Sequence, residues 1–182
     1  MQETDDELVR RIRGGDEAAF RELVNRHGDA LYAMAVAALG SAADAEDIVQ
    51  ETFLGAFRRL GAFEGRSSVK TWLVRILLNH VSKLRRSRRV RQAMSLDQQP
   101  GGLADRRLES RSPAAAVESR VDVAAMLREL SPEHRDVIVL RELRQMSYDE
   151  MAEALRVPRG TIESRLHRAR QELKRRFGGY LS

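Results

Sequence analysis

Apolar residues recur along most of this chain with the spacing of one helix face, and no segment shows the strict apolar–polar alternation that marks a strand. Capping residues, glycines and prolines divide the pattern into separate helices. The predicted helices are Asp5 to Arg13, Asp16 to Gly40, Ser41 or Asp44 to about Leu60, Val69 to about Arg89, Ala115 to Leu130, Pro132 to about Leu143, Tyr148 to Leu155, and Arg159 or Gly160 to Phe177. The sequence therefore predicts an all-α fold.

The stretch from Val90 to Ala114 interrupts this periodicity. It contains the run Gln-Gln-Pro-Gly-Gly at residues 98–102 and a second proline near its end. Such residues favour turns and flexible connections over packed helices. We therefore expect two small helical domains, at residues 1–90 and 115–182, with a flexible linker at residues 91–114 between them.

The last part of the chain carries the most specific local signal, two short helices joined by a tight turn. Ser147 begins the first helix with a capping box: its hydroxyl accepts a hydrogen bond from the amide of Glu150, and the Glu150 carboxylate accepts one from the amide of Ser147. Pro158 ends that helix, because proline disfavours helical geometry in the residue before it and is itself tolerated only at a helix start. This spacing predicts a helix-turn-helix unit.

The second of these helices is basic on one face. In projection, its apolar face consists of Ile162, Leu166, Ala169, Leu173 and Phe177, and its polar face of Ser164, His167, Arg168, Gln171 and Arg175. From Arg156 to Arg176 there are eight Lys or Arg residues and two acidic residues. Such a helix can hold phosphates and present side chains to base edges in a major groove, so we favour DNA reading over a merely solvated face.

The third predicted helix has an unusual polar face. Its core stripe is expected to contain Ile48, Val49, Thr52, Phe53, Ala56, Phe57 and Leu60, and the opposite strip to contain Asp47, Gln50, Glu51, Leu54 and Arg58. A solvent face with one isolated leucine explains this strip most simply, since single surface leucines are common. The alternative is a docking face for a basic partner helix, with the leucine as its anchor.

The fourth predicted helix carries a second basic cluster. Its core face holds Leu73, Leu77, Val81 and Leu84, and the other side holds Trp72, Arg75, Ile76, Asn79, Lys83 and Arg86. A tryptophan beside Arg and Lys is the composition that stacks unpaired bases and follows a phosphate backbone, although a lone tryptophan at this spacing is also typical of a core. Six basic residues and no acidic residue lie between Lys83 and Arg91.

Charge and composition narrow the function classes. The 182-residue chain has a net charge of +5, while the basic clusters at Lys83–Arg91 and Arg156–Arg176 each carry +6, so the remainder carries −7. Positive charge gathered at two places suits a protein that touches one DNA molecule at two sites. The chain has no cysteine, which excludes disulfides, thiolate metal sites and thiol nucleophiles.

Signals for an enzyme or a membrane protein are weak. The four histidines are scattered, the acidic residues show no metal-ligand spacing, and no glycine-rich phosphate loop is present. No apolar run approaches the roughly 20 residues of a membrane span, and the acidic start from Met1 to Glu7 is unlike a leader. We therefore expect a cytoplasmic protein without membrane insertion, catalytic residues, metal or cofactor.

Five motifs occur in the order found in one protein family. They are Asp44 to Phe53, Phe63 to Ser68, Thr71 to Ile76 with Asn79, Leu130 to Arg135, and Gly160 to Arg170. Together they resemble the bacterial RNA polymerase sigma factors of the extracytoplasmic-function (ECF) subfamily, and the resemblance covers nearly the whole chain. It implies two helical domains, regions two and four, that bind core RNA polymerase and recognise the minus-ten and minus-thirty-five elements of promoter DNA.

The resemblance also implies roles for particular residues. Those that dock on the beta-prime clamp helices of core polymerase are Asp47, Gln50, Glu51 and Leu54. Those at the minus-ten element are Phe63, Arg66, Ser67, Ser68, Trp72, Arg75, Asn79, Lys83 and Arg86. Within this set, the loop from Phe63 to Ser68 receives a flipped base.

For region four, the resemblance implies contacts with the minus-thirty-five element and with the beta flap of polymerase. The residues at the minus-thirty-five element are Arg159, Thr161, Glu163, Ser164, Arg165, His167, Arg168 and Gln171. Glu163 departs from the family pattern, where Lys or Arg is frequent, and Lys83 stands where some relatives have a neutral polar residue. A carboxylate at position 163 could accept from a cytosine amino group but would repel phosphate, so a different minus-thirty-five preference is expected.

The same resemblance bears on the expected protein partner, and alternative functions have to be weighed against it. Two exposed basic surfaces would bind DNA without specificity, so we expect an anti-sigma factor that covers one or both domains. The alternative function is a stand-alone helix-turn-helix regulator that binds duplex DNA without polymerase, at palindromic half-sites. A nucleic-acid enzyme is the least favoured class.

Overall fold

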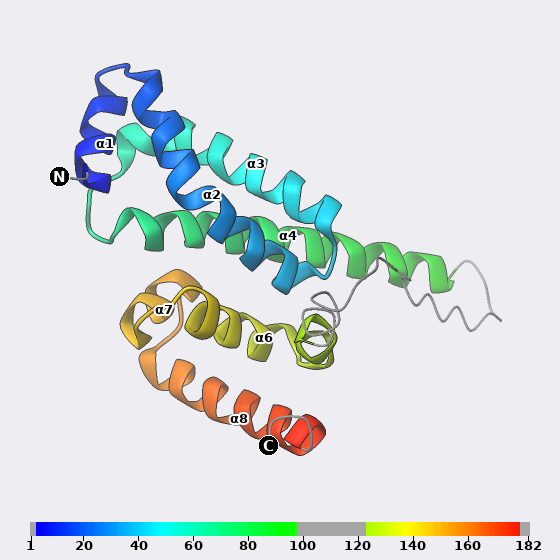
Figure 1. Ribbon diagram of the computed structural model, residues 1–182. Coiled ribbons are helices and arrows are strands. Elements are labelled where there is room, and N and C mark those ends of the chain that lie inside the picture. Colours follow the sequence, from blue (N-terminus) through cyan, green and yellow to red (C-terminus); the bar gives the residue numbers. More distant parts are fainter. Residues whose placement is uncertain (1–2, 98–122, 179–182) are drawn as a thin grey trace, which may run out of the picture.

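The computed structural model describes residues 3–97 and 123–178, and every regular element in these stretches is helical (Figure 1). The N-terminal stretch contains α1 (Asp5–Arg13), α2 (Glu17–Leu39), α3 (Ala42–Arg59), the 3-10 helix η1 (Leu60–Ala62) and α4 (Val69–Asp97). The C-terminal stretch contains a helix at residues 123–129, then α6 (Pro132–Ile138), the π-helical turn η2 (Val139–Leu143), α7 (Tyr148–Leu155) and α8 (Arg159–Phe177). The predicted all-α fold with two helical domains is confirmed. Predicted linker residues 98–114 and predicted helix residues 115–122 lie outside the described stretches.

Capping side chains and glycines end the helices where the sequence indicates. Asp16 accepts hydrogen bonds from the amides of Ala18 and Ala19 at 2.9 and 3.2 Å, which satisfies two of the free donors at the start of α2. Gly40 follows α2 in the left-handed conformation, with φ of 70°. Ser131 caps α6 and precedes a proline at the first helical position, as predicted.

The N-terminal domain is a helical bundle with one apolar core. α2, α3 and α4 pack side by side, and α1 lies against α2 (Figure 1). The largest fully buried side chains of this domain are Leu8, Leu23, Leu31, Met34, Leu60, Leu73 and Leu77. Fully burying a leucine side chain is worth about 2 kcal/mol relative to leaving it exposed, so this cluster is the main source of the bundle's stability.

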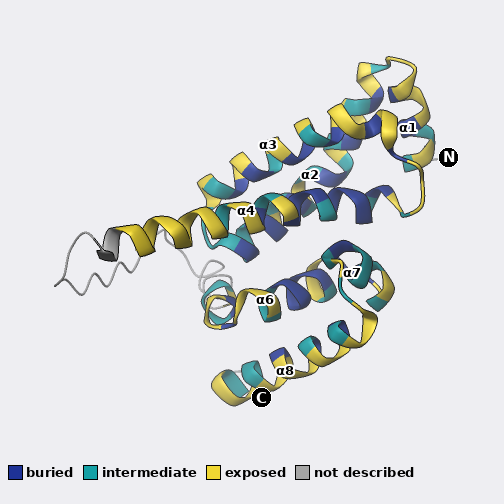
Figure 2. Ribbon diagram, turned by 180° about the vertical axis from the view of Figure 1, so that it is seen from behind, coloured by how far each residue is buried: buried dark blue, intermediate teal, exposed yellow. Residues whose placement is uncertain are grey.

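α4 ends later than the sequence analysis expected. We predicted an end near Arg89, whereas the helix continues to Asp97. Residues 90–97 contain neither proline nor glycine, so no residue there stops helical geometry. Figure 2 shows that this last part of α4 projects beyond the other helices, and residues 86–94 are all exposed.

The C-terminal domain packs α6 and α7 against α8. Its largest fully buried side chains are Leu140, Met146, Met151, Ile162 and Leu166. The π-helical turn η2 joins α6 to the segment before α7, and Gln145 there has a positive φ of 53°. The buried residues of α8, Ile162, Leu166 and Ala169, share one face, so this helix packs on its own domain through one side.

The two domains contact each other along α4. α7 lies beside α4, while η2 and α6 contact α2. Arg85 of α4 donates two hydrogen bonds to Asp136 of α6, at 2.9 and 3.0 Å. At the end of α2, a Cβ added to Gly40 would lie 3.2 Å from Cδ of Arg128, so the C-terminal domain closely approaches the glycine that ends this helix.

Candidate nucleic-acid and protein interfaces

α7, the turn after it and α8 form the helix-turn-helix unit that the sequence predicts. The capping box is present: the Glu150 amide donates to Ser147 Oγ at 3.2 Å, and the Ser147 amide donates to Glu150 Oε2 at 2.7 Å. The hydrogen bond from the Ser147 amide, together with the Ser147 hydroxyl and the nearby Lys70, holds the pKa of Glu150 below its usual range. Arg156 ends α7 in the left-handed conformation, and α8 begins directly after Pro158.

α8 presents the face that the sequence assigned to DNA. Ile162, Leu166 and Ala169 are buried against the rest of the domain. The exposed residues of the expected minus-thirty-five set are Arg159, Glu163, Ser164, His167, Arg168 and Gln171, and the half-buried ones are Thr161 and Arg165. The exposed face therefore carries cations and hydrogen-bonding groups that can reach phosphates and base edges.

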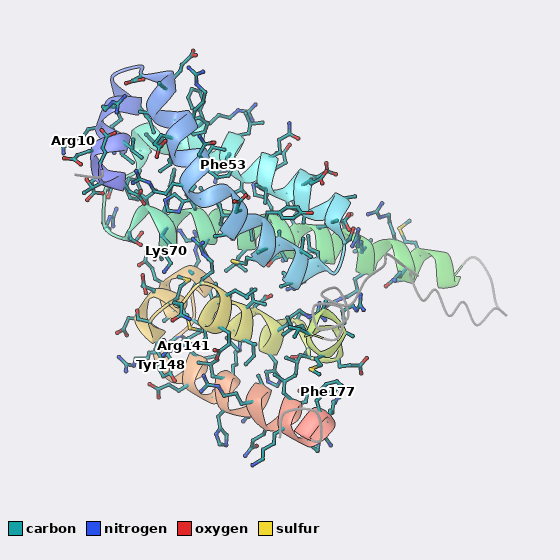
Figure 3. All side chains as sticks on the ribbon, viewed as in Figure 1. Arg10, Phe53, Lys70, Arg141, Tyr148 and Phe177 are labelled. Carbon is teal, nitrogen blue, oxygen red and sulfur yellow. The ribbon has the colours of Figure 1, made fainter. Side chains whose placement is uncertain are left out.

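Acidic residues engage Arg159 at the start of α8. Its guanidinium donates to Glu163 at 3.0 Å and to Asp149 of α7 at 3.1 Å, and it lies 5.9 Å from the ring centroid of Tyr148. Arg141 lies 5.5 Å from the same ring, and Figure 3 shows Arg141 and Tyr148 together beside the start of α7. Glu163 foremost, and then Asp149, raise the pKa of Arg159. Glu163 thus neutralises a neighbouring cation on the exposed side of α8.

α4 presents a narrower basic strip. Asn79, Lys83 and Arg86 are exposed, and they lie within a 60° sector of the helix at 100° per residue. Arg75, on the edge of this sector, is half-buried and its Nη1 lies 3.5 Å from Glu153 of α7. The strip can therefore follow a backbone of phosphates over about two helical turns.

Two residues that the sequence analysis placed on the outer side of α4 are buried. Trp72 is 7% exposed, because the ring of Phe63 covers it with ring centroids 4.9 Å apart. Ile76 is buried beside α3, where Gly55 allows close approach: a Cβ there would lie 3.7 Å from Ile76 Cγ2. Trp72 therefore supports the loop before α4 and presents no free ring face for stacking in this conformation.

The loop from Phe63 to Ser68 is fixed at both ends. Arg13 of α1 donates to the backbone oxygens of Leu60 and Phe63, and Ser68 Oγ accepts from the amide of Thr71 at 3.1 Å at the start of α4. Beside this loop lies a hollow of about 360 Å³, lined by Ala62, Phe63, Glu64, Arg66, Ser67, Trp72, Arg75, Glu153 and Arg156. Exposed Arg66 pairs with Glu64 at its rim. The hollow is of the size that can take a small planar group.

The predicted docking strip of α3 is on the surface. Asp47, Gln50, Glu51 and Leu54 are all exposed, and Leu54 is 40% exposed. Gln50 and Leu54 also line a groove of about 570 Å³ between α2 and α3, together with Glu17, Phe20, Arg21 and Phe57. The apolar part of this surface is therefore larger than the single leucine seen in the sequence.

Phe57 was predicted to belong to the core of α3, and this prediction is wrong. The side chain is 52% exposed and packs edge-on against Phe20 of α2, with ring centroids 4.9 Å apart. Phe57 lies at the border of the predicted apolar sector, where periodicity alone cannot separate core from rim. Sequence reasoning also did not assign Phe20 to this surface, although its ring lines the same groove.

Metal-binding clusters and membrane-spanning helices are absent from residues 3–97 and 123–178. In these stretches, no group of three or more His, Asp or Glu side chains is arranged to hold a metal ion. None of the helices there is long and apolar enough to cross a bilayer.

Comparison with known proteins identifies both domains. The family model "Sigma-70 region 2" matches residues 23–91, and "Sigma-70, region 4" matches residues 120–173. The chain is 37% identical over 175 residues to the RNA polymerase sigma factor NccH of Alcaligenes xylosoxydans xylosoxydans, covering 93% of this chain and 92% of that protein. It is 34% identical over 177 residues to the ECF RNA polymerase sigma-E factor of Salmonella typhimurium, covering 93% and 92%.

Solved structures agree with this assignment. CnrH in complex with the cytosolic domain of CnrY superposes with a TM-score of 0.75 at 29% identity, over 97% of this chain and 99% of that one. The sigma factor RpoE of Bartonella quintana, in complex with the anti-sigma factor NepR, superposes with a TM-score of 0.67 at 28% identity, over 86% and 94%. By sequence, domain order and fold, the chain belongs to the ECF subfamily of bacterial RNA polymerase sigma factors.

Proposed function

We propose that this sigma factor uses three separate surfaces to bring core RNA polymerase to its promoters: the strip on α3, the loop and strip of α4, and the exposed face of α8. The observation that carries the proposal is the placement of two exposed basic helix faces on separate domains, together with an acidic and apolar face on α3. The chain contributes no catalysis in this proposal, because the chemistry of RNA synthesis belongs to the polymerase.

The α3 surface binds the beta-prime clamp helices of core polymerase. Asp47 and Glu51 supply negative charge that complements a basic partner helix, and Gln50 supplies hydrogen bonds. Leu54 is the apolar anchor, and the adjoining groove beside Phe57 accommodates apolar side chains of the partner. This surface lies away from α7, so it is free in the conformation described.

The loop and strip of α4 recognise the minus-ten element and help to open it. The hollow beside Phe63 and Ser67 receives a flipped base, and the exposed Asn79, Lys83 and Arg86 contact the strand that leads to it. Extruding a base costs a few kcal/mol, which contacts in such a pocket must offset. Buried Trp72 positions the loop from beneath.

The exposed face of α8 reads the minus-thirty-five element in a major groove. Ser164, His167, Arg168 and Gln171 reach base edges and phosphates, and Arg165 and Thr161 lie at the margin. Glu163 pairs with Arg159 in the free chain, so the start of α8 carries less positive charge than its sequence suggests. This pair sets a minus-thirty-five preference different from that of relatives with a cation at position 163.

Several further features belong to the same proposal. The functional domains are residues 1–90 and 115–182, joined by a linker at 91–114, and the second also contacts the beta flap of polymerase. The protein acts in the cytoplasm, on the nucleoid when bound to polymerase. An anti-sigma factor restrains it, a proposal supported by the complex of the similar factor RpoE with NepR.

The test is run-off transcription by bacterial core polymerase on a library of randomised promoters, with and without this chain. Start sites that appear only with the chain are expected, and their upstream sequences will give both promoter elements. If no start site depends on the chain while it still binds duplex DNA by itself, the proposal is wrong.

A further inference from the structure

Arg159, the first residue of α8, is held in place by three side chains. Its Nε donates to Oε1 of Glu163 at 3.0 Å, one turn further along α8, and its Nη1 donates to both oxygens of Asp149, at 3.2 and 3.1 Å. Its guanidinium carbon lies 5.9 Å from the ring centroid of Tyr148. Because Tyr148 and Asp149 begin α7, the start of one helix fixes the side chain that begins the next.

The ring of Tyr148 is itself tied to the core of the domain. The guanidinium carbon of Arg141 lies over this ring, 5.5 Å from its centroid, and a cation in such a position is attracted by the electrons of the aromatic face. Nη1 of Arg141 also donates to the backbone oxygen of Met146 at 2.8 Å, and Met146 is fully buried. The position of Arg159 is therefore set from inside the domain as well as by surface charges.

These contacts leave one oxygen of Glu163 available for a further hydrogen bond. Arginine and a carboxylate commonly pair through two parallel hydrogen bonds, which would use both oxygens. Here Asp149 draws the guanidinium toward α7, and Glu163 accepts from it through Oε1 alone. Within residues 3–97 and 123–178, no donor is bonded to Oε2 of Glu163 and no acceptor to Nη2 of Arg159. The exposed start of α8 thus offers one charged acceptor beside one charged donor.

An acceptor beside a donor matches the major-groove edge of a C·G base pair. Cytosine presents its N4 amino group as a donor, and guanine presents two acceptors, whereas thymine presents one acceptor and a methyl group. Glutamate suits the cytosine amino group and arginine suits guanine. Residues near the N-terminus of a recognition helix are the ones that contact base edges, and Glu163 is the fifth residue of α8. A carboxylate already paired with a cation also repels phosphate less than a free one.

We propose that Glu163 and Arg159 read one C·G base pair of the minus-thirty-five element as a unit, and that Tyr148 and Asp149 are positioning residues that keep Oε2 of Glu163 available to the cytosine amino group. This inference rests on the proposed function of α8 and deepens it. Without Asp149 or the ring of Tyr148, the guanidinium of Arg159 can turn and pair with both oxygens of Glu163. The acceptor for cytosine is then occupied, although no residue that meets DNA has been changed.

Selection from a randomised duplex library tests this inference. The holoenzyme formed from the full chain and bacterial core polymerase is used to capture duplexes, which are then sequenced. The parent should enrich a cytosine at one position of the minus-thirty-five element. Glu163→Ala should lose that preference and keep the preferences at other positions. Asp149→Ala and Tyr148→Leu should each weaken the preference for cytosine several-fold and leave the other positions unchanged.

A modified base tests the hydrogen bond itself. In a duplex of the selected sequence, this cytosine is replaced by pyrimidin-2-one, which lacks the N4 amino group. The parent holoenzyme should bind the modified duplex about tenfold more weakly than the unmodified one. Glu163→Ala should bind both duplexes equally, and this comparison also accounts for the weaker pairing of the modified base. Asp149→Ala and Tyr148→Leu should show a smaller difference than the parent.

Glu142→Ala is the matched control for Asp149→Ala. It too removes an exposed carboxylate that pairs with an arginine of α8, here Arg170 at 3.1 Å, but this pair lies further along the helix. It should leave the preference for cytosine unchanged. The conservative variant Tyr148→Phe keeps the ring and should retain the preference that Tyr148→Leu weakens. A merely structural role of either residue would lower binding to all sequences alike.

The outcomes separate this inference from the proposed function. A preference for cytosine that survives in Glu163→Ala would overturn the inference, as would an enriched element without this cytosine. Base preferences of Asp149→Ala and Tyr148→Leu equal to those of Glu142→Ala would overturn the positioning roles. In each of these cases the parent still selects a minus-thirty-five element, so the proposed function of α8 stands. A parent that selects no such element would contradict that function and the inference with it.

Discussion

α8 and α4 both present basic side chains to solvent, but they are packed in different ways. α8 is covered on one side, by its own domain, so its exposed side is set by a single apolar stripe that includes Ile162 and Leu166. α4 is covered on two sides: Leu73 and Leu77 lie in the bundle core, while the opposite side contacts α7. The surface of α8 is thus a local property, whereas that of α4 depends on the position of the other domain.

The largest expected effect comes from truncating a side chain in the buried apolar stripe that packs α8 on its domain. Leu166→Ala deletes a fully buried side chain and should lower the free energy of unfolding of the C-terminal domain by about 3 kcal/mol. Urea denaturation followed by circular dichroism measures it. Arg168→Ala, on the exposed face of the same helix, should change stability by less than about 0.5 kcal/mol. Equal losses for both variants would show that α8 is covered on two sides, as α4 is.

Leu54→Asp separates binding from folding in the N-terminal domain. A charge at the centre of the α3 strip should weaken binding to core polymerase by at least about tenfold, because the anchor is lost, while helix content stays intact. The measurement is affinity by fluorescence anisotropy. Leu143→Asp makes the same change at an exposed leucine of the other domain and should have little effect on docking at the clamp helices. Unchanged affinity of Leu54→Asp would mean that α3 is not the docking face.

Two arginine variants compare the two helices that we propose to contact DNA. Arg168→Ala on α8 should weaken holoenzyme binding to closed, fully duplex promoters by about 1–3 kcal/mol. Arg86→Ala on α4 should chiefly weaken binding to promoters already unpaired at the minus-ten element. Filter-binding measurements on both templates distinguish the effects of the two variants. If each variant affected both templates alike, the division of labour between α4 and α8 would be wrong.

His27 of α2 makes the stability of the folded chain depend on pH. Burial, partly offset by Asp5, lowers the pKa of His27 below 6.5 in the folded chain. The folded state binds this proton less readily than the unfolded state does. The contribution of His27 to the free energy of unfolding is therefore complete above pH 6.5. It is lost as pH falls through the lower, folded pKa, by at most about 1.4 kcal/mol per pH unit. Thermal unfolding between pH 7 and 5 should show this loss, and His27→Gln should flatten it. An identical slope in the variant would exclude His27 as the cause.

The smallest effect is expected at the start of α8. Glu163→Gln removes the partner of Arg159 and leaves that guanidinium free to meet phosphate, so non-specific duplex binding should rise a few-fold. The selected minus-thirty-five sequence should change in the randomised library as well. Glu172→Gln, on the same helix but half-buried and paired with Arg176, is the control. Equal gains in duplex binding for both variants would mean that the effect comes from net charge and not from the release of Arg159.

Local signals predicted several helix ends correctly, although not the end of α4. The capping box of Ser147 and Glu150, the left-handed Gly40 and the cap at Ser131 each depend on residues close in sequence, and each is present. The exposed face of α8 was predicted for the same reason, because one apolar stripe decides which side is buried. These features need no knowledge of the other domain.

Features that depend on distant packing were missed. Val74 and Leu78 of α4 are buried although neither was predicted for its core face, because the periodicity of one helix reveals only one partner surface. Trp72 is buried by a ring that precedes it by nine residues, across a loop whose course the pattern does not define. The roles of the site residues in polymerase and promoter binding stay predictions until the variants above are measured.

Gly40 joins two requirements at one position. Its φ of 70° is a conformation that glycine adopts freely and residues with a side chain rarely adopt, and a Cβ there would lie 3.2 Å from Cδ of Arg128. Any other residue at position 40 would therefore strain the end of α2 and displace the Arg128 side chain by a few tenths of an ångström. A single small residue thus sets both where α2 ends and how closely the two domains approach, at a site that touches neither DNA nor polymerase in our proposal.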